Sequence, residues 1–245
     1  MTTPSREELR GGEGGAHRII DMMTDEVNRW LRERTTTGDV YDATYDRRAA
    51  AGEDVHGEAT FVMRFSPTSV LDAGCGTGRV GRQLARRNVE VVGVDLDAEM
   101  LGTARRKAPD VDWQLGDLST VDLGRPFDAI VMAGNVMIFL EPGTEGAVLA
   151  NMARHLSPGG VLIAGFQLQP GRLTLGRYDE IAVATGLAPA ERWATWDCGP
   201  WVAGGAYAVS VHRRGCGLAK SDDSEEQPGG GPEMLRCEEP HKWTH

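Results

Sequence analysis

The sequence predicts an α/β fold built on a doubly wound, mostly parallel sheet. Short runs rich in Val, Ile and Leu alternate with helical stretches of roughly 10–15 residues, a pattern typical of strands covered on both faces by crossover helices. A chain of 245 residues is also long enough to bury a large core without a metal or a disulfide. The expected strands are 69–73, 89–94, 111–115, 128–133 and 161–166, and the helices between them are about 78–87, 97–107 and 143–156.

The flanking elements complete this order. A helix over about 53–65 comes before the first strand, and a helix over about 173–185 follows the last parallel strand. Two further strands, around 191–196 and 206–211, are separated by a loop with no room for a helix, so we expect them to be antiparallel neighbours. An N-terminal amphipathic helix that ends near residues 35–38 is indicated by the stripe Ile19, Met23, Val27, Trp30 and Leu31.

Composition separates both ends of the chain from its centre. Residues 1–15 are polar and glycine-rich, which predicts a disordered arm. Residues 216–245 combine acidic side chains with Pro and Gly, which predicts an acidic disordered tail. We therefore expect one folded domain over residues 16–215.

Charge and cysteine usage narrow the choice of partners and compartment. Lys and Arg number 26 against 36 Asp and Glu, a net charge of −10 that opposes binding to nucleic acid or to anionic membranes. The start of the chain lacks the apolar run of a signal peptide, and the longest apolar stretch, 129–140, is shorter than the ~20 residues that cross a bilayer. The four cysteines are scattered without a CxxC pair, as expected of reduced thiols in a cytoplasmic protein.

The turn after the first expected strand carries the strongest local signal. It reads DAGCGTGR over residues 72–79, and its alternating glycines remove side chains that would keep a ligand from the backbone. The next helix begins there, so its free N–H groups suit a carboxylate or a phosphate. Ligands of doubly wound sheets bind at such turns. We therefore place the ligand site at this turn.

Acidic residues follow the next two strands. Asp95 closes the second strand about 20 residues after Gly74, where a carboxylate accepts both hydroxyls of a ribose. Asp117 follows the third strand, where a carboxylate can accept from an amino group such as that of adenine. Each acid alone is also typical of a turn or a helix cap. With Asp72, the three at consecutive strand ends indicate a nucleoside.

Two common cofactors contain a nucleoside that could bind at this turn, NAD and S-adenosyl-L-methionine. Residues 76–81 match the G-x-G-x-x-G pattern of NAD-binding turns, but Asp72 and Gly74 come before the match and would place an acid near a pyrophosphate. S-adenosyl-L-methionine carries a cationic sulfonium, which suits an acidic neighbour. The register therefore favours S-adenosyl-L-methionine over NAD.

Four segments resemble, in order, the motifs of class I S-adenosylmethionine-dependent methyltransferases. They are VLDAGCGTGRVG (70–81), VVGVDLD (91–97), GD (116–117) and LSPGGVL (156–162). The resemblance implies a Rossmann-like, seven-stranded sheet with an antiparallel last strand and an N-terminal helical lid. It also implies methyl transfer to an O, N or C atom of a small-molecule acceptor.

The same resemblance implies roles for single residues. The glycine loop (74–78) would contact the methionine moiety, Asp95 the ribose and Asp117 the adenine amino group, while Asp72 would order the loop. Leu96 and Leu118 would sandwich the adenine. Tyr41 or Tyr45 would touch the methionine carboxylate or would simply pack in the lid. The expected cofactor-binding residues are Tyr45, Asp72, Gly74, Cys75, Gly76, Gly78, Asp95, Leu96, Gly116, Asp117, Leu118, Ala133 and Asn135.

No catalytic residue is assigned from the sequence. A sulfonium is already a good methyl donor, so the protein need mainly align a nucleophile. The candidate bases His56 and His212 are more typical of structural positions. Asn135 either lines the methyl-transfer mouth or is a turn residue. The cluster Trp193, Trp196 and Trp201 either faces an apolar acceptor or packs as a lid.

The absence of one motif bears on the acceptor. Enzymes that methylate amino groups of nucleic acids carry, by resemblance, an acid or Asn followed by Pro-Pro and an aromatic residue after the fourth strand, whereas this chain has Ala133-Gly134-Asn135-Val136. A small-molecule acceptor is therefore favoured. A non-catalytic cofactor-binding module and an NAD-dependent oxidoreductase stay open as alternatives. No metal site is expected, because the tail residues Cys216, Cys237, His241 and His245 lack a paired CxxC.

Overall fold

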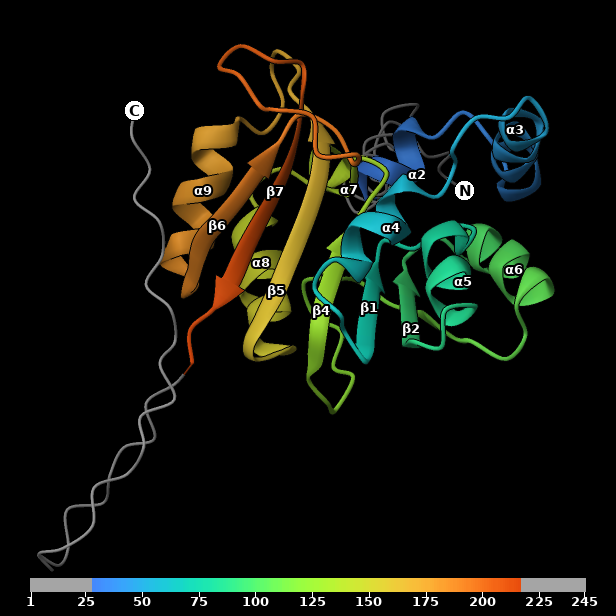
Figure 1. Cartoon of the computed structure of the whole chain (residues 1–245), viewed down its shortest axis with the longest axis horizontal. Helices are drawn as coiled ribbons and strands as arrows, with labels where there is room; N and C mark the ends of the chain where they lie inside the picture. The colour runs from blue at the N-terminus through green and yellow to red at the C-terminus, as the bar shows by residue number, and fades with distance from the viewer. Residues whose placement is uncertain (1–27, 217–245) are drawn as a thin grey trace, which may run out of the picture.

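A seven-stranded sheet forms the centre of the computed structural model, which describes residues 28–216 (Figure 1). Its order is β3-β2-β1-β4-β5-β7-β6. All neighbours up to β5 are parallel, and β7 runs antiparallel between β5 and β6, which confirms the expected sheet and its last strand. The strands are β1 (Ser69–Ala73), β2 (Glu90–Asp95), β3 (Asp112–Leu115), β4 (Phe127–Met132), β5 (Leu156–Gln167), β6 (Leu187–Trp193) and β7 (Tyr207–Arg214).

The strand order reverses between β1 and β4. The chain adds β2 and β3 on one side of β1 and then returns to place β4 on the other side. The crossover connections on the two sides diverge at this point, which leaves a crevice beyond the carboxyl ends of the strands. The glycine loop leaves β1 at this crevice.

Helices cover both faces of the sheet (Figure 1). Alternate strand residues point to opposite faces, so Leu71 packs with the helices of one face and Val70 with those of the other. One face is covered by α7 (Val136–Phe139), α8 (Glu145–Arg154) and α9 (Leu175–Ala184). The other is covered by α4 (Gly57–Met63) and α5 (Arg79–Ala85), and α6 (Ala98–Lys107) packs beside β2 and β3.

Two helices lie beyond the carboxyl ends of the strands, α2 (Arg29–Glu33) and α3 (Gly38–Ala50) (Figure 1). Only Gly38 and Asp42 of α3 are buried. A helix without a buried apolar stripe gives no hydrophobic period, which explains why the sequence pattern did not predict it.

Other elements differ from expectation mainly at their ends. The helix expected from residue 53 begins at Gly57, with His56 as its N-cap residue. Strand β5 begins at Leu156 rather than near 161, because it first pairs with Phe127 across a register shift. Most of the helix expected around 19–31, the arm 1–15 and residues 217–245 of the tail lie outside the described residues.

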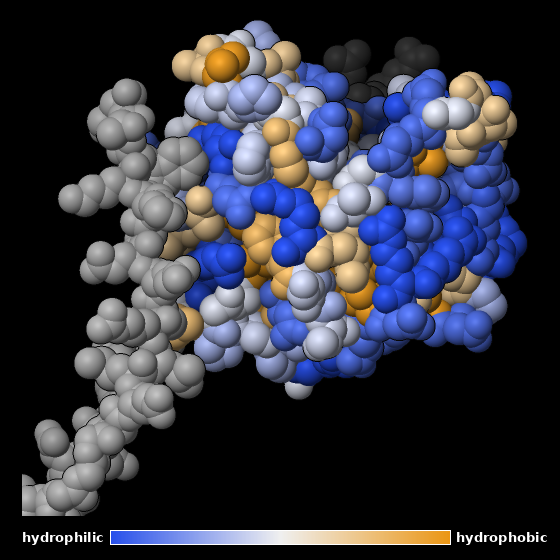
Figure 2. Space-filling model, viewed as in Figure 1, coloured by the Kyte–Doolittle hydropathy of each residue, from blue (hydrophilic) through white to orange (hydrophobic). Residues whose placement is uncertain are grey.

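Helix length also bears on membranes. The α3 helix has 13 residues, and no helix within residues 28–216 is both long and apolar enough to cross a bilayer. Figure 2 shows a largely hydrophilic surface over α5 and α6, on the side where α3 lies.

Polar side chains are buried between β7 and α9. His212 is 0% exposed, and neither of its ring nitrogens has a hydrogen-bond partner among the described residues. The Tyr178 ring packs edge-on against it, and Asp179, which is ion-paired to Arg192, lies 3.6 Å from Nε2. Burial lowers the pKa of His212 to about 4, so the ring is neutral at neutral pH.

We expect this burial to cost stability in acid. An unfolded histidine titrates near 6.5, so acidification protonates the unfolded chain first, and the folded state loses about 2 kcal/mol by pH ~4.5. The glutamine in His212→Gln does not titrate. Between neutral pH and pH ~4.5 the free energy of unfolding of this variant should therefore fall by about 2 kcal/mol less than that of the wild type. Urea unfolding of both proteins at the two pH values measures it, and an equal pH dependence in both would contradict it.

Candidate active site

A cavity of about 440 Å³ lies between the carboxyl ends of the strands and helices α2 and α3, which we call the lid. Eleven of the thirteen expected cofactor residues line it, although they come from five separate segments of the chain. These are Tyr45, Asp72, Gly74, Cys75, Gly76, Asp95, Leu96, Asp117, Leu118, Ala133 and Asn135.

Gly78 and Gly116 do not line the cavity but shape its wall. Gly78 has φ +73°, and a Cβ there would lie 2.5 Å from the Trp113 ring. The N–H of Gly116 donates to the carbonyl oxygen of Asp95, and a Cβ would lie 3.2 Å from Val121. Both glycines therefore allow close packing next to the cavity.

The glycine loop opens its backbone to the cavity at Gly76. This residue has φ +54°, and a Cβ there would meet nothing within 4 Å. Gly74, with φ +76°, instead lets the loop approach α7, since a Cβ would lie 2.5 Å from Val136. A ligand can therefore reach the main chain between these two glycines.

The carboxylate that holds the loop is that of Asp95. Its Oδ2 accepts the N–H of Gly76 at 2.7 Å, and its Oδ1 accepts the N–H of Asp97 at 2.8 Å. The residue is 9% exposed, and burial raises its pKa to about 6. Asp72, to which the resemblance gave the loop-ordering role, accepts the N–H of Gly81 in α5 at 2.8 Å. Burial raises the pKa of Asp72 to about 7.

The third acid lies at the open side of the cavity. Asp117 is exposed, and its Oδ1 accepts the N–H and the hydroxyl of Ser119 at 2.7 and 2.6 Å. Leu96 and the buried Leu118 line the cavity with it. The structure thus brings all three acids to one cavity, as their strand-end positions predicted.

Two tyrosines and an arginine close the cavity on the side of α3. The Tyr41 and Tyr45 hydroxyls are 3.2 Å apart, and the Arg79 guanidinium lies 4.2 Å from the centre of the Tyr45 ring. Arg79 is also ion-paired to Glu58. Burial raises the pKa of Tyr41 well above its usual range, so its hydroxyl stays protonated.

The sequence predicted an N-terminal helical lid but not the cavity contacts that α2 makes. Trp30 lines the cavity, donates its ring N–H to Asp97 at 3.0 Å and packs edge-on against Phe139. Arg34 also lines the cavity and is ion-paired to Asp97 at 3.1 Å. The available signal was the single stripe that ends at Trp30 and Leu31, which gives no indication of what it covers.

Several candidate residues lie away from the cavity. Neither His56 nor His212 lines it. The Trp cluster does not face it either, since Trp196 packs against Phe61 and donates to the Tyr207 hydroxyl. Of the two readings of the cluster, packing is therefore the one that fits.

Asn135 is a turn residue that also lines the cavity. It adopts φ +69° at the turn into α7, its Oδ1 accepts the N–H of Gln167 at 2.8 Å, and it lines the cavity.

No group of His, Cys, Asp or Glu among residues 28–216 could hold a metal ion. Cys237, His241 and His245 lie outside that range.

Known proteins share this fold and these motifs. A family model described as a methyltransferase domain matches residues 70–160. The crystal structure of a TehB-like SAM-dependent methyltransferase from Corynebacterium glutamicum is 36% identical, with a TM-score of 0.67, over 72% of this chain and 97% of that chain.

Two curated enzymes are similar over shorter stretches. The dTDP-3-amino-3,4,6-trideoxy-alpha-D-glucopyranose N,N-dimethyltransferase of Streptomyces venezuelae is 36% identical over 132 residues, 51% of this chain and 54% of that protein. The trans-aconitate 2-methyltransferase of Azoarcus sp. (strain BH72) is 36% identical over 146 residues, 58% of this chain and 50% of that protein. The chain thus spans about half the length of the curated relatives it matches.

The fold and the motifs together place the chain in a family. It belongs to the class I S-adenosylmethionine-dependent methyltransferases, and S-adenosyl-L-methionine is the cofactor of this family. The cavity fits that group, because the Gly76 backbone is open, two acids with raised pKa values line the wall and leucine side chains lie beside Asp117.

We predict that Asp95→Ala weakens cofactor binding. Loss of charge-assisted hydrogen bonds, and of the carboxylate that holds Gly76, should cost about 1–3 kcal/mol, or roughly 5- to 150-fold in Kd. Calorimetry with S-adenosylhomocysteine measures the change. Asp110→Ala, an exposed turn residue outside the cavity, is the control and should bind as the wild type does. Equal affinity of the two variants would remove Asp95 from the site.

Cofactor affinity should also fall in acid. Ligand hydroxyl and ammonium groups favour the ionised forms of Asp72 and Asp95, whose pKa values in the free protein are about 7 and 6. Binding then releases protons below neutral pH, so affinity is full above about pH 7 and declines as the pH falls. Calorimetry from about pH 8 to about 5.5 tests this. In Asp72→Asn, cofactor affinity should begin to fall only at a lower pH than in the wild type. A wild-type affinity that does not change with pH would contradict this prediction.

Proposed function

We propose that this protein transfers a methyl group from S-adenosyl-L-methionine to a small-molecule acceptor. The observation that carries the proposal is the single cavity that joins an open glycine loop to three strand-end carboxylates. When bound, the cofactor supplies a methyl group on a positively charged sulfur. Membership of the family and the acceptors named for its relatives support the proposal.

The cofactor-binding roles follow from chemistry at each wall of the cavity. Asp95 is proposed to accept the ribose hydroxyls, and Asp117, which keeps free lone pairs, the adenine amino group. Leu96 and Leu118 offer apolar faces to the adenine. The Gly76 backbone and the Tyr45 hydroxyl are proposed to contact the methionine moiety.

The residues around the cavity favour alignment over proton transfer. Its described lining contains no histidine and no lysine, and the Tyr41 hydroxyl stays protonated. Asp72, Asp95 and Asp117 are assigned to the cofactor site, and arginine partners lower the pKa values of Glu33 and Glu141. A nucleophile that arrives deprotonated needs only a correct approach, and positioning can contribute several kcal/mol, up to about 7–11. This favours an acceptor that presents a neutral amine or a carboxylate. The named substrates of the curated relatives, an amino sugar nucleotide and aconitate, fit these two groups.

The extent and setting of the domain are part of the same proposal. Its strands and helices between Arg29 and Arg214 agree with a domain over residues 16–215. The net charge of −10 supports an acceptor other than nucleic acid, and the scattered cysteines support a cytoplasmic location.

We expect labelled methyl transfer to one of these two acceptor classes. The protein is incubated with methyl-labelled cofactor and two panels, small amines including nucleotide amino sugars and small polycarboxylates, and the products are separated by mass. Transfer should occur within one panel and should fall with Asp95→Ala in proportion to cofactor affinity. Binding of S-adenosylhomocysteine without transfer to any acceptor would instead favour a cofactor-binding module without turnover.

A further inference from the structure

Helix α3, which carries Tyr41 and Tyr45 to the cavity, is docked on the protein by polar contacts. Of its residues only Gly38 and Asp42 are buried, and its one aliphatic residue larger than Ala, Val40, is 59% exposed. Gly38 allows close approach to α6, since a Cβ there would lie 2.7 Å from the Thr103 hydroxyl. The apolar contribution to holding α3 therefore comes from the half-buried rings of Tyr41 and Tyr45 and not from aliphatic side chains.

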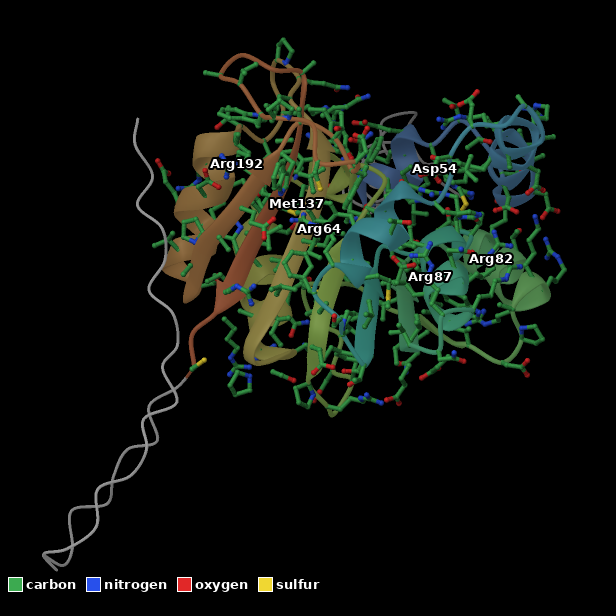
Figure 3. The ribbon with its side chains drawn as sticks, viewed as in Figure 1. Asp54, Arg64, Arg82, Arg87, Met137 and Arg192 are labelled. Carbon is green, nitrogen blue, oxygen red and sulfur yellow. The ribbon has the colours of Figure 1, made fainter. Side chains whose placement is uncertain are left out.

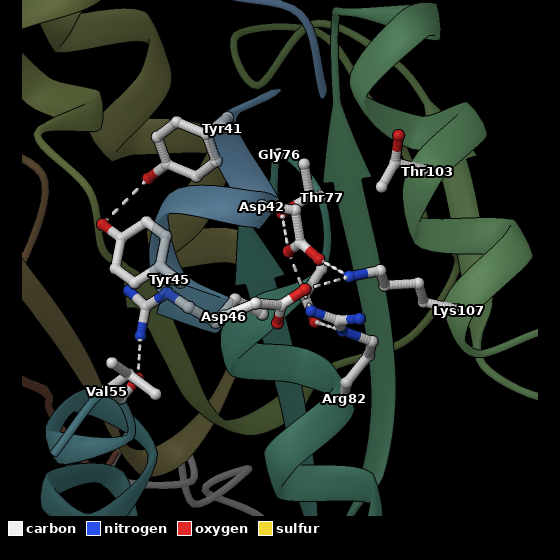
Figure 4. Close-up of polar contacts among 12 residues, drawn as sticks. Tyr41, Asp42, Tyr45, Asp46, Val55, Gly76, Thr77, Arg82, Thr103 and Lys107 are labelled. Atoms are coloured by element: carbon white, nitrogen blue, oxygen red, sulfur yellow. Dashed lines mark hydrogen bonds and ion pairs between the residues drawn. The ribbon is translucent and has the colours of Figure 1, made fainter. Parts of the chain in front are cut away.

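The central contact is the Asp42 carboxylate, which is 1% exposed (Figure 4). Its Oδ1 accepts from the Thr77 hydroxyl and from the Arg82 guanidinium, each at 3.0 Å. Its Oδ2 accepts from the Lys107 ammonium. We call Asp42, Thr77, Arg82 and Lys107 the latch. Arg82, labelled in Figure 3, belongs to α5, and Lys107 belongs to α6, so the latch joins α3 to both helices.

One member of the latch belongs to the glycine loop. Thr77 is 1% exposed and stands between Gly76 and Gly78, both of which have positive φ. The N–H of Gly76 is bound to Asp95. Two carboxylates thus hold adjacent residues of the loop. Asp95 of the sheet accepts from Gly76, and Asp42 of the lid accepts from Thr77.

The charges of the latch depend on Asp42. Two cations converge on this carboxylate, and its hydrogen bond raises the pKa of Lys107 above the usual range. Asp46 contacts the same Lys107 at 3.2 Å, but its side chain is 70% exposed. Without the Asp42 side chain, the partly buried Arg82 guanidinium loses its ion pair and the Thr77 hydroxyl loses its acceptor, whereas loss of Asp46 removes only an exposed pair.

We propose that Asp42 is a positioning residue for the cofactor, because its carboxylate ties the lid helix that carries Tyr41 and Tyr45 to the glycine loop at Thr77. The position of α3 and the conformation of the glycine loop then depend on each other. A lid that detaches releases the loop from one side and opens the cavity to water. The inference rests on the proposed cofactor site and goes beyond it, since Asp42 does not line the cavity.

The first test compares two matched variants on one helix, Asp42→Asn and Asp46→Asn. Asp42→Asn should weaken S-adenosylhomocysteine binding by about tenfold or more, because the buried carboxylate loses its charge and with it both ion pairs. Hydrogen exchange over residues 38–50, measured without ligand, should become faster in the same variant. Asp46→Asn should stay within about twofold of the wild type in both measurements.

A second variant separates coupling from loss of fold. Thr77→Val keeps both ion pairs and the shape of the side chain but removes the hydroxyl that joins lid and loop. It should weaken binding and speed exchange over 38–50. In an Asp42→Ala background, which has no side-chain acceptor for the hydroxyl, Thr77→Val should weaken binding no further. Thr77 also lines the cavity, so faster exchange of α3 without ligand is the result that a direct ligand contact would not produce.

The outcomes separate the two proposals. If the wild type does not bind S-adenosylhomocysteine, the proposed function fails. If the wild type binds but Asp42→Asn matches Asp46→Asn, or the Thr77 and Asp42 effects on affinity add independently, the positioning role of Asp42 is overturned.

Discussion

The hydrogen bond from the Gly76 N–H to Asp95 fixes the floor of the cavity. It holds a loop that leaves β1 to the carboxyl end of the neighbouring β2, and it forms only because the parallel register places those strand ends side by side. The loop can make this turn because Gly74, Gly76 and Gly78 all adopt positive φ. Register, backbone freedom and one buried carboxylate therefore together determine where a ligand can lie.

Burial of the acids makes the site electrostatically responsive. Asp72 and Asp95 lie in the wall of the cavity with raised pKa values, so each pays a desolvation cost as a carboxylate in the free protein. A ligand with a cationic sulfur and hydroxyl donors offsets that cost. The same burial that destabilises these charges thus favours the cofactor over a neutral or anionic molecule.

The sequence predicted the parts of the molecule that follow a period or a fixed spacing. Strands such as β1 read as buried apolar runs, and the strand-end acids Asp95 and Asp117 follow from topology. Helix α3 has no apolar period, because ion pairs dock it, so its existence and the contacts of Asp42 could not be predicted. The position of the Trp196 ring depends on its packing against Phe61, a contact distant in sequence that no local pattern encodes.

The lid and the body of the protein therefore rely on different physical forces. Apolar packing holds the sheet between its helices, whereas the buried Asp42 carboxylate holds α3 to the glycine loop through Thr77 and to α5 and α6 through two ion pairs. A crystal structure with S-adenosylhomocysteine would show whether these groups bind the cofactor. We expect ribose hydroxyls on the Asp95 carboxylate, with adenine between Leu96 and Leu118 and the Gly76 contact intact. A ligand bound elsewhere, or a ribose directed away from Asp95, would contradict it.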